Sequence, residues 1–305
     1  MHAKRRAVAG GRTVKVLYDS HEDAAGLREH YGARRSEAFA EVEATYIGEV
    51  DAIVTVSPQL AGRLQRRYSL KTQPAVVLNA PPQGSAHTEV PSLRRSIGLD
   101  ADVSLGVYAG GVNKNRGLDL LIEAVGRMPR FHVALVLTAI SQRTEDLLLD
   151  LTRRFGVEDR VHIVPAVLPH EVAAYLSEGD VGFVVASNEV ANHNVSLPNK
   201  LFEYLQAGLP IVTSNLAALE EFVEEHGVGC VFPYPDVGSL VECVGRVLED
   251  KLAFQQAITP AFLRRFSWEG SQEKLLAVYG DLLAVQLQPA SIPLDLTVNR
   301  HPAAS

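Results

Sequence analysis

Short apolar runs alternate with segments of helical periodicity along most of this chain, and the alternation is most regular after residue 103. Apolar runs of about four to eight residues are typical of buried strands, whereas apolar residues at every third or fourth position predict helices. This pattern predicts strands at 104–109, 132–138, 161–164, 181–186, 211–213 and 229–232, each followed by a helix. Strands that alternate with helices form parallel sheets with right-handed crossovers, so we expect an α/β domain with a doubly wound sheet.

A shorter part with the same alternation precedes this domain. The pattern predicts strands at 14–18, 52–56 and 76–78, a helix at 34–48, and a helix that begins at Pro58 with Ser57 as its N-cap. A run rich in Pro, Gly and Ser between Ala80 and Leu99 is typical of a linker. We therefore expect an N-terminal domain over residues 1–90 and a C-terminal domain over residues 99–266.

The end of the chain contains one further amphipathic segment. Residues 267–287 have helical periodicity, with Ser267 as the expected N-cap, and they predict a final helix. Residues 288–305 contain Pro and Ala without any periodicity, so we expect a disordered tail there.

Residues 196–215, SLPNKLFEYLQAGLPIVTSN, form the most informative stretch. Pro198 suits the first turn of a helix, the following apolar residues keep helical spacing, and a glycine marks the helix end. Asn199 and Lys200 then lie at the helix N-terminus, and Glu203 lies one turn further. Free N–H groups there favour a phosphate, and a carboxylate can accept hydrogen bonds from sugar hydroxyls. The alternative is a glutamate that only complements the helix dipole.

A second candidate site is the turn YAGGVNKNRG, which joins a predicted strand to a helix. Gly110 and Gly111 allow a ligand to approach the backbone closely. Lys114 and Arg116 place two cations near the start of the next helix. Together these residues can hold a pyrophosphate by charge-assisted hydrogen bonds. The alternative is an ordinary glycine-rich turn with solvated Lys and Arg side chains.

A polar cluster, DSHED, follows the first predicted strand. Open α/β sheets bind their ligands at the carboxyl ends of strands, which makes Asp19, His21 and Glu22 candidates for a functional site. His21 can act at this site or can be a structural histidine, and the sequence leaves both possibilities open.

The segment PNKLFEYLQAGLPIV resembles the donor-binding helix of glycosyltransferase family 4, and YDSHED, DAIVTVSPQLAGRL and VVLNAPP resemble the second half of that family's N-terminal domain. The resemblance covers residues 14–285. It implies a GT-B fold, in which two Rossmann-like domains each contain a parallel sheet. Because the first strands of the N-terminal domain have no counterpart here, we expect that domain to be incomplete.

The resemblance also implies a reaction. Members of the family transfer a sugar from a nucleotide-diphospho-sugar to a hydroxyl acceptor, with retention at the sugar and without a metal or other cofactor. The acceptor can be a glycan, a lipid-linked molecule or a small molecule. We therefore expect a nucleotide-sugar donor and a hydroxyl acceptor as the partners of this chain.

Roles for the donor-binding residues follow from the same resemblance. Glu203 matches the glutamate that binds the ribose hydroxyls, and Arg116 matches a basic residue that contacts the phosphates. Many members carry an earlier Arg where this chain has Gly110, and Lys114 is a candidate replacement. The predicted donor-binding residues are Gly110, Gly111, Lys114, Arg116, Pro198, Asn199, Lys200 and Glu203.

The predicted catalytic residues are His21, Asn194 and Ser196. His21 matches a histidine beside the donor sugar and the acceptor pocket, and the other two precede the donor-binding helix. The family often has a second glutamate that faces the sugar, where this chain has Val195. Branches with an LPNKLFEY-type helix also lack that glutamate, so its absence does not exclude activity.

Other functions remain open. Val195 and the incomplete first domain favour an inactive nucleotide-sugar binder, or a subunit that completes another glycosyltransferase. A partner chain or a homo-oligomer would cover the apolar edges of a small sheet. A dehydrogenase of the Rossmann type is disfavoured, because no GxGxxG follows a first strand.

Charge limits the classes of partner. The 305 residues include 29 Lys and Arg against 36 Asp and Glu, a net charge of −7 that argues against nucleic-acid binding. The first third is nevertheless net basic, which suits an anionic membrane surface or an anionic acceptor. We prefer the alternative of solvated helix faces, for example at Arg63, Arg66 and Arg67.

The two cysteines, Cys230 and Cys243, lie in apolar contexts without CxxC spacing. We interpret them as buried thiols of a reducing compartment, and neither as a disulfide nor as metal ligands. The sequence contains no apolar run long enough to cross a bilayer and no apolar signal core near Met1. We expect a cytoplasmic protein, with peripheral contact at the inner membrane face as a further expectation.

Overall fold

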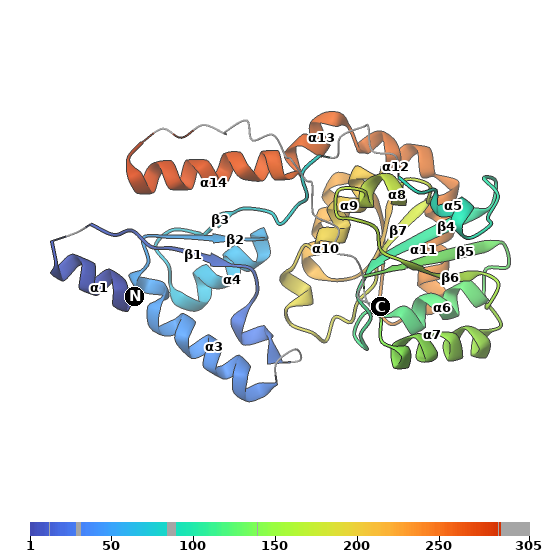
Figure 1. Ribbon diagram of the computed structural model, residues 1–305, viewed down its shortest axis with the longest axis horizontal. Helices are drawn as coiled ribbons and strands as arrows, with labels where there is room; N and C mark the ends of the chain where they lie inside the picture. Colours follow the sequence, from blue (N-terminus) through green and yellow to red (C-terminus); the bar gives the residue numbers. More distant parts are fainter. Residues whose placement is uncertain (12, 29–31, 84–89, 139, 286, 288–305) are drawn as a thin grey trace, which may run out of the picture.

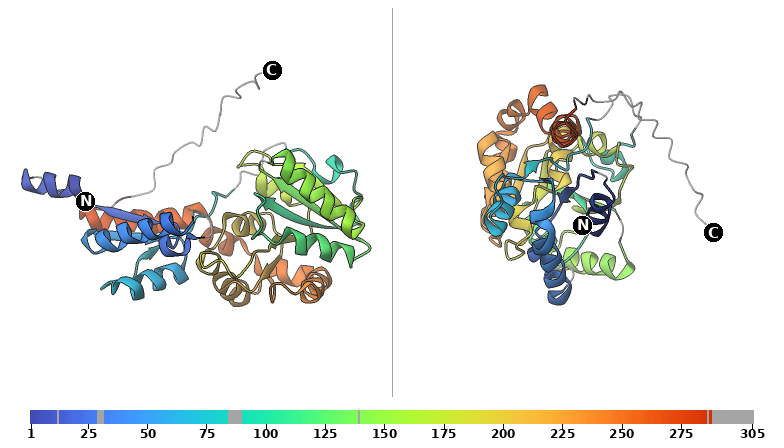
Figure 2. Two further views of the ribbon diagram at one scale, coloured as in Figure 1. Left: turned by 90° about the horizontal axis from the view of Figure 1, so that it is seen from below. Right: turned by 90° about the vertical axis from the view of Figure 1, so that its left-hand side faces the viewer.

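The computed structural model describes residues 1–11, 13–28, 32–83, 90–138, 140–285 and 287. The chain forms two lobes that each surround a parallel sheet, as Figure 1 and the two views of Figure 2 show. The predicted α/β class with parallel sheets is confirmed. The tail expected at residues 288–305 lies outside the described residues.

The C-terminal lobe contains a six-stranded sheet in the order β6-β5-β4-β7-β8-β9. Its strands are β4 (Ser104–Gly110), β5 (Phe131–Leu137), β6 (Val161–Pro165), β7 (Val181–Val184), β8 (Ile211–Ser214) and β9 (Gly229–Phe232). All of the pairings are parallel. Because the order reverses between β4 and β7, the sheet is doubly wound, as the alternation of strands and helices predicts.

Helices cover both faces of this sheet (Figure 1). One face packs against α6 (Leu118–Gly126), α7 (Gln142–Phe155) and α11 (Val237–Glu249). The other packs against α8 (Val172–Leu176), α9 (Asn199–Gln206) and α10 (Ala217–His226). The interior of β4 is buried on both sides, which explains why the central strands are apolar runs without alternation. The smaller helices α5 (Leu93–Ser96), α12 (Lys251–Ala257) and α13 (Pro260–Arg265) have too few apolar repeats for the pattern to predict them.

The N-terminal lobe contains a three-stranded sheet in the order β1-β2-β3. Its strands are β1 (Leu17–Ser20), β2 (Ala52–Thr55) and β3 (Ala75–Val76), and its helices are α1 (His2–Ala9), α3 (Ala33–Tyr46) and α4 (Pro58–Tyr68). Two 3-10 turns, η1 (Ala24–Gly26) and η2 (Ile47–Glu49), connect these elements, and a third, η3 (His193–Val195), lies in the other lobe. The sequence pattern did not predict α1.

The N-cap predicted at Ser57 is confirmed, because its Oγ accepts a hydrogen bond from the Leu60 N–H at 3.0 Å. The same hydroxyl donates to the Val195 carbonyl of the other lobe. Ser57 therefore ends a strand, starts a helix and joins the two lobes.

The interpretation of Arg63 and Arg67 as solvated side chains is incomplete, because each is 31% exposed and also forms an ion pair. Both guanidinium groups bind Asp23, whose side chain is only 1% exposed. Burial raises the pKa of Asp23, but the hydrogen bonds from Arg67 and Arg63 outweigh it and leave the pKa below its usual value. Arg66 is exposed as expected. Part of the basic character of the first third therefore neutralises a buried carboxylate.

Helix α14 (Trp268–Leu283) returns along the N-terminal lobe and contacts β2 and β3 (Figure 1). Ser267 occupies the predicted N-cap position, but its hydroxyl donates to the Arg264 carbonyl instead of accepting from the helix N-terminus. The start of α14 is held by the Trp268 N–H, which donates to the Pro81 carbonyl at 3.0 Å.

The interpretation of the cysteines was also wrong. Cys230 on β9 and Cys243 on α11 form a disulfide with an S–S distance of 2.08 Å. A strand and the helix that follows it bring the two side chains together, which the absence of a CxxC spacing could not reveal. The two cysteines therefore give no support to the expectation of a reducing compartment. Within the described part of the chain, no helix is long and apolar enough to cross a membrane.

Candidate functional site

The order of strands in the C-terminal lobe places a cavity beside the carboxyl ends of β4 and β7. This is the point where the two halves of a doubly wound sheet diverge, and ligands of such sheets bind there. The cavity has a volume of about 330 Å³. It is lined by Glu22, Gly26, Leu27, Asn113, Lys114, Asn115, Arg116, Val184, Ala186, Val190, Asn192, His193, Ser196, Pro198, Leu216 and Leu219.

The turn after β4 supplies one wall of this cavity. The Asn115 N–H donates to Asn113 Oδ1 within the turn, and the Asn115 carbonyl accepts from the Ser187 N–H in the loop after β7. Gly117 ends the turn with φ +58°, and a Cβ there would lie 2.5 Å from Val185 Cγ1. Only glycine fits this position. The backbone of the turn after β4 therefore packs directly against the Val185 side chain, which follows β7.

Helix α9 supplies a second wall. Its apolar face is buried, and the fully buried Tyr204 fixes the helix to the sheet. The Tyr204 hydroxyl accepts from the Ala109 N–H at 2.8 Å and donates to the Phe183 carbonyl at 3.2 Å. One side chain thus ties α9 to both β4 and β7. Pro198 is the N-cap and lines the cavity, so the N-terminus of α9 faces it.

Lys200, on the first turn of α9, reaches back to β4. Its Nζ lies 3.7 Å from the centroid of the Tyr108 ring, a cation–π distance. A Cβ added to Gly110, whose φ is +131°, would lie 3.2 Å from this Nζ. Burial and the nearby Arg116 charge, only partly offset by Glu203, lower the pKa of Lys200 to about 7. Lys114 was the predicted replacement for the Arg that many family members carry at the position of Gly110. The cation that lies beside Gly110 is instead Lys200.

Glu203 is half-buried one turn further along α9. Burial raises the pKa of its carboxyl group, and the Lys200 charge counteracts the rise. No hydrogen bond or ion pair of this carboxylate occurs with any residue that the structure describes. Its oxygens are therefore available to an added donor.

Lys114 and Arg116 line the cavity, whereas Asn199, Lys200 and Glu203 do not. Among the ion pairs of the described ranges, none involves Lys114, Arg116 or Lys200, and Arg116 is close enough to depress the pKa of Lys200. Asn199 is exposed beside them, and Gly111 has open space on its Cα. Unpaired cations beside a helix N-terminus favour an anion with several oxygens, such as a diphosphate.

The N-terminal lobe closes the cavity from the other side, through Glu22, Gly26 and Leu27. The Asp23 N–H donates to Asn192 Oδ1 across the lobes at 3.0 Å. His21 precedes them, forms an exposed pair with Asp19 at 3.1 Å and lines a different depression, described below. Glu22 lines both spaces, so His21 lies next to the cavity without forming its wall.

The other two predicted catalytic residues hold the loop before α9. Asn194 Nδ2 donates to the carbonyls of Asn188 and Val190, and Asn194 does not line the cavity. Ser196 lines it, although its hydroxyl donates to the Asn192 carbonyl at 2.6 Å. The roles of all the predicted site residues stay predictions.

Sequence reasoning missed several wall residues, chiefly Asn113, Asn192 and His193. They lie in the turn GGVNKN and in the polar loop SNEVANHNV, each of which follows a predicted strand. The position of these loops at the carboxyl ends of β4 and β7 is the signal that could have identified them.

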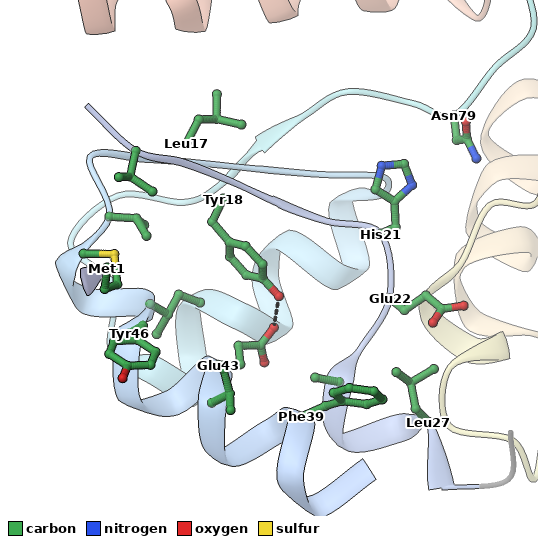
Figure 3. Close-up of a pocket in the computed structure, with 15 residues that line it drawn as sticks. Met1, Leu17, Tyr18, His21, Glu22, Leu27, Phe39, Glu43, Tyr46 and Asn79 are labelled. Carbon is green, nitrogen blue, oxygen red and sulfur yellow. Dashed lines mark hydrogen bonds between the residues drawn. The ribbon is translucent and has the colours of Figure 1, made fainter. Parts of the chain in front are cut away.

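A second depression lies on the N-terminal lobe, and we call it the edge groove (Figure 3). It has a volume of about 900 Å³. Its lining residues are Met1, Val16, Leu17, Tyr18, His21, Glu22, Ala24, Leu27, Phe39, Val42, Glu43, Tyr46, Ile47, Val50 and Asn79. The Tyr18 and Tyr68 hydroxyls donate to the Glu43 carboxylate at 2.7 and 2.6 Å. Figure 3 shows the bond from Tyr18.

Comparison with known proteins identifies the class of the C-terminal lobe. Residues 104–250 match the family described as "Glycosyl transferases group 1". This range contains both the turn after β4 and helix α9. The resemblance to glycosyltransferase family 4 that the sequence motifs suggest is therefore confirmed.

Curated relatives match a larger part of the chain. A D-inositol 3-phosphate glycosyltransferase of Xylanimonas cellulosilytica is 29% identical over 260 residues, which cover 81% of this chain and 60% of that protein. An enzyme of the same name from Corynebacterium diphtheriae is 24% identical over 288 residues, which cover 88% of this chain and 65% of that protein. The chain thus spans less than two thirds of the length of these relatives.

Solved structures confirm the GT-B fold. Sucrose-phosphate synthase from Thermosynechococcus elongatus aligns with a TM-score of 0.72 at 20% identity, covering 92% of this chain and 71% of that one. The Anabaena protein HepE in complex with UDP-glucose aligns with a TM-score of 0.71 at 14% identity, covering 92% and 75%. The match includes both lobes, because it extends over nine tenths of the chain.

Proposed function

We propose that this chain binds a nucleotide-diphospho-sugar in the cavity between the lobes and transfers the sugar to a hydroxyl acceptor with retention. The observation that carries the proposal is that Lys114 and Arg116 line the cavity beside the N-terminus of α9 without carboxylate partners in the described residues, with Lys200 close to Arg116. The family match and the relatives that are named glycosyltransferases support the same reading.

In this proposal the cations hold the diphosphate. When the bond between the sugar C1 and the phosphate oxygen breaks, negative charge develops on that oxygen, and fixed positive charges stabilise it. The acceptor oxygen forms the new bond to C1 on the same face, and its proton passes to the departing diphosphate. Arg116, Lys114 and Pro198 at the α9 N-terminus line the cavity, which supports a role for them in stabilising the leaving group.

Glu203 is proposed to bind the ribose of the donor. Its carboxylate is half-buried, has no partner among the residues described and lies one turn from Lys200. A carboxylate that accepts from two adjacent hydroxyl groups fixes the position of the nucleoside, and with it the position of the diphosphate. The acceptor would enter from the N-terminal lobe, past Glu22 and His21.

Calorimetric titration with UDP-glucose and other nucleotide sugars, followed by detection of product, tests the proposal. Saturable binding together with a glycosylated product supports it in full. Binding without turnover, in the presence of a range of hydroxyl acceptors, would favour the inactive binder or the subunit of another enzyme. An absence of binding to every nucleotide sugar and to every nucleoside diphosphate contradicts the assignment of the cavity.

A further inference from the structure

The walls of the cavity between the lobes carry charges of opposite sign. Lys114 and Arg116 line it from the turn after β4, and Glu22 lines it from the N-terminal lobe. Glu22 is the only carboxylate among the described residues that line this cavity. A ligand in the cavity therefore meets positive charge from the C-terminal lobe and negative charge from the N-terminal lobe.

The main chain around Glu22 is held in place on both sides. The Ser20 hydroxyl donates to the Glu22 carbonyl at 3.2 Å. The next residue, Asp23, donates its N–H to Asn192 Oδ1 of the other lobe at 3.0 Å, and its buried carboxylate is paired with two arginines of α4. These contacts fix the point from which the Glu22 side chain reaches the cavity.

The side chain of Glu22, in contrast, is exposed. Within the described part of the chain, its carboxylate takes part in no hydrogen bond and no ion pair. Figure 3 shows the side chain extending from the end of β1 toward the yellow segments of the C-terminal lobe. A carboxylate of this kind accepts hydrogen bonds from hydroxyl groups and repels a second carboxylate.

The proposed function determines which part of the donor lies beside Glu22. The diphosphate lies against Lys114 and Arg116, and the acceptor arrives from the N-terminal lobe. The sugar lies between them, because its C1 must reach the acceptor oxygen. It therefore occupies the part of the cavity that Glu22 lines. The reverse orientation would place two negative phosphates beside the carboxylate, which like-charge repulsion disfavours.

We propose that Glu22 is a specificity-determining residue that favours a donor with a neutral sugar and rejects a donor whose sugar carries a carboxylate. This inference rests on the proposed function and deepens it by naming the class of sugar. A hydroxyl group of a neutral hexose can donate to the Glu22 carboxylate, whereas a uronic acid places a second negative charge near it. Rejection of the wrong ligand by an unfavourable charge contributes to specificity as much as attraction of the right one does.

Titration calorimetry with UDP-glucose and UDP-glucuronic acid tests this proposal on the intact chain. The two ligands share the base, the ribose and the diphosphate, so the ratio of their affinities isolates the effect of the sugar. We expect wild type to bind UDP-glucose at least about tenfold more tightly than UDP-glucuronic acid. If guanosine diphosphate binds more tightly than UDP, GDP-mannose and GDP-mannuronic acid form the equivalent pair.

Two variants of one residue separate charge from shape. Glu22→Gln keeps the size of the side chain and removes its charge, so it should lower the affinity ratio at least about fivefold. Glu22→Lys should reverse the preference, because it places a cation near the uronate. Glu189→Gln is the control, because Glu189 is exposed in the loop after β7 and does not line the cavity. This control should leave the ratio unchanged.

Salt provides an independent readout. Because salt screens the interaction between exposed charges, the wild-type ratio should fall as ionic strength rises, whereas a purely steric preference would not change. The ratio of Glu22→Gln should depend much less on salt.

Three outcomes would overturn the proposal. The first is a ratio that is the same in wild type, Glu22→Gln and Glu22→Lys. The second is a decrease that Glu189→Gln reproduces, which would assign the preference to the overall charge of the chain. The third is a wild-type preference that salt leaves unchanged. In each case UDP still binds, so only the role of Glu22 fails, whereas an absence of binding to every nucleoside diphosphate contradicts the proposed function as well.

Discussion

The Lys200 ammonium group lies 3.7 Å from the centroid of the Tyr108 ring, close to the backbone of Gly110. An aromatic face stabilises a cation only in part, and burial lowers the pKa of Lys200 to about 7 while it raises the pKa of Tyr108 to about 12. Under the proposed function, a negatively charged ligand beside Lys200 would favour the charged form of this side chain.

The first prediction concerns pH. A bound diphosphate favours the charged form of Lys200, so its pKa rises and binding takes up a proton wherever free Lys200 is neutral. Nucleoside diphosphate affinity should therefore fall as pH rises above 7, by at most about tenfold per pH unit for one proton. The ligand phosphates are already ionised in this range, with a second pKa near about 6. Calorimetry in buffers of different ionisation enthalpy measures the proton uptake.

Lys200→Arg is the matched variant for this measurement, because an arginine keeps its charge throughout the pH range. The affinity of this variant should be nearly independent of pH between 7 and 9. A wild-type profile that is equally flat, or that Lys200→Arg leaves unchanged, would remove Lys200 from the phosphate site.

The second prediction concerns Glu203. Its replacement by Ala should weaken UDP binding by about 1–3 kcal/mol, because two ribose hydroxyls lose their acceptor. The loss should vanish with a dideoxyribose analogue of UDP, which lacks those hydroxyls. Titration calorimetry gives both values, and Glu224→Ala, at an exposed position of α10, serves as the control. Equal losses for UDP and its dideoxy analogue would show that Glu203 does not bind the ribose.

The third prediction concerns Arg116. Arg116→Ala should reduce the affinity for UDP by about 1.5–3 kcal/mol, the range for hydrogen bonds to charged groups, and should leave uridine affinity unchanged. Arg130→Ala, an exposed arginine after α6, should alter neither. If the two ligands lose affinity equally, the guanidinium contacts the nucleoside or supports the fold, and the phosphate role is excluded.

The fourth prediction concerns the glycine that joins the walls of the cavity. Gly117→Ala should lower the free energy of unfolding by about 1–3 kcal/mol from overpacking alone, since the new Cβ would lie 2.5 Å from Val185 Cγ1. The φ of +58° adds strain for any residue with a Cβ. Gly111→Ala is the control, because a Cβ there meets nothing within 4 Å. Urea unfolding compares the two, and equal stabilities would contradict the packing described.

The fifth prediction concerns Asp23. Because its pKa is lower in the folded chain than in the unfolded chain, its stabilising effect is present near neutral pH and disappears as pH falls through the folded value. Asp23→Asn should therefore make the free energy of unfolding less dependent on pH at acid pH. The cost near pH 7 should stay below the about 3–5 kcal/mol of a fully buried pair, since the Arg63 and Arg67 side chains remain 31% exposed.

Urea unfolding at several pH values measures the contribution of Asp23. Asp150→Asn removes a surface pair with Arg153, in which the Asp150 side chain is 72% exposed, and should cost about 0–1 kcal/mol. If the free energy of unfolding falls equally with acid in wild type and in Asp23→Asn, other carboxylates determine the loss of stability at low pH.

The sequence pattern predicts the fold well where apolar runs are long and regular. Strands β4, β5 and β9 lie within one or two residues of their predicted bounds, because each is a mainly apolar run of strand length. Helix α1 and the short helices α12 and α13 were missed, because they have few buried side chains and their periodicity is weak.

The candidate site was predictable only in part. The motifs identified Arg116, Lys114, Pro198 and Ser196, which line one cavity. They could not reveal that Lys200 takes the place beside Gly110, because this depends on how far α9 lies from β4. Nor could they reveal the disulfide or the ion pairs of Asp23 with Arg63 and Arg67. These residues are separated in the sequence, and a local pattern does not show that they are close in space.

The two segments that join the lobes run side by side. The Pro81 carbonyl, on the first segment, accepts hydrogen bonds from the Trp268 N–H on the second and from Gln206 Nε2 at the end of α9, both at 3.0 Å. A swing of one lobe against the other that keeps these hydrogen bonds would pivot near Pro81. A small rotation about that hinge would widen the mouth of the cavity most at Glu22 and would leave the cation group intact.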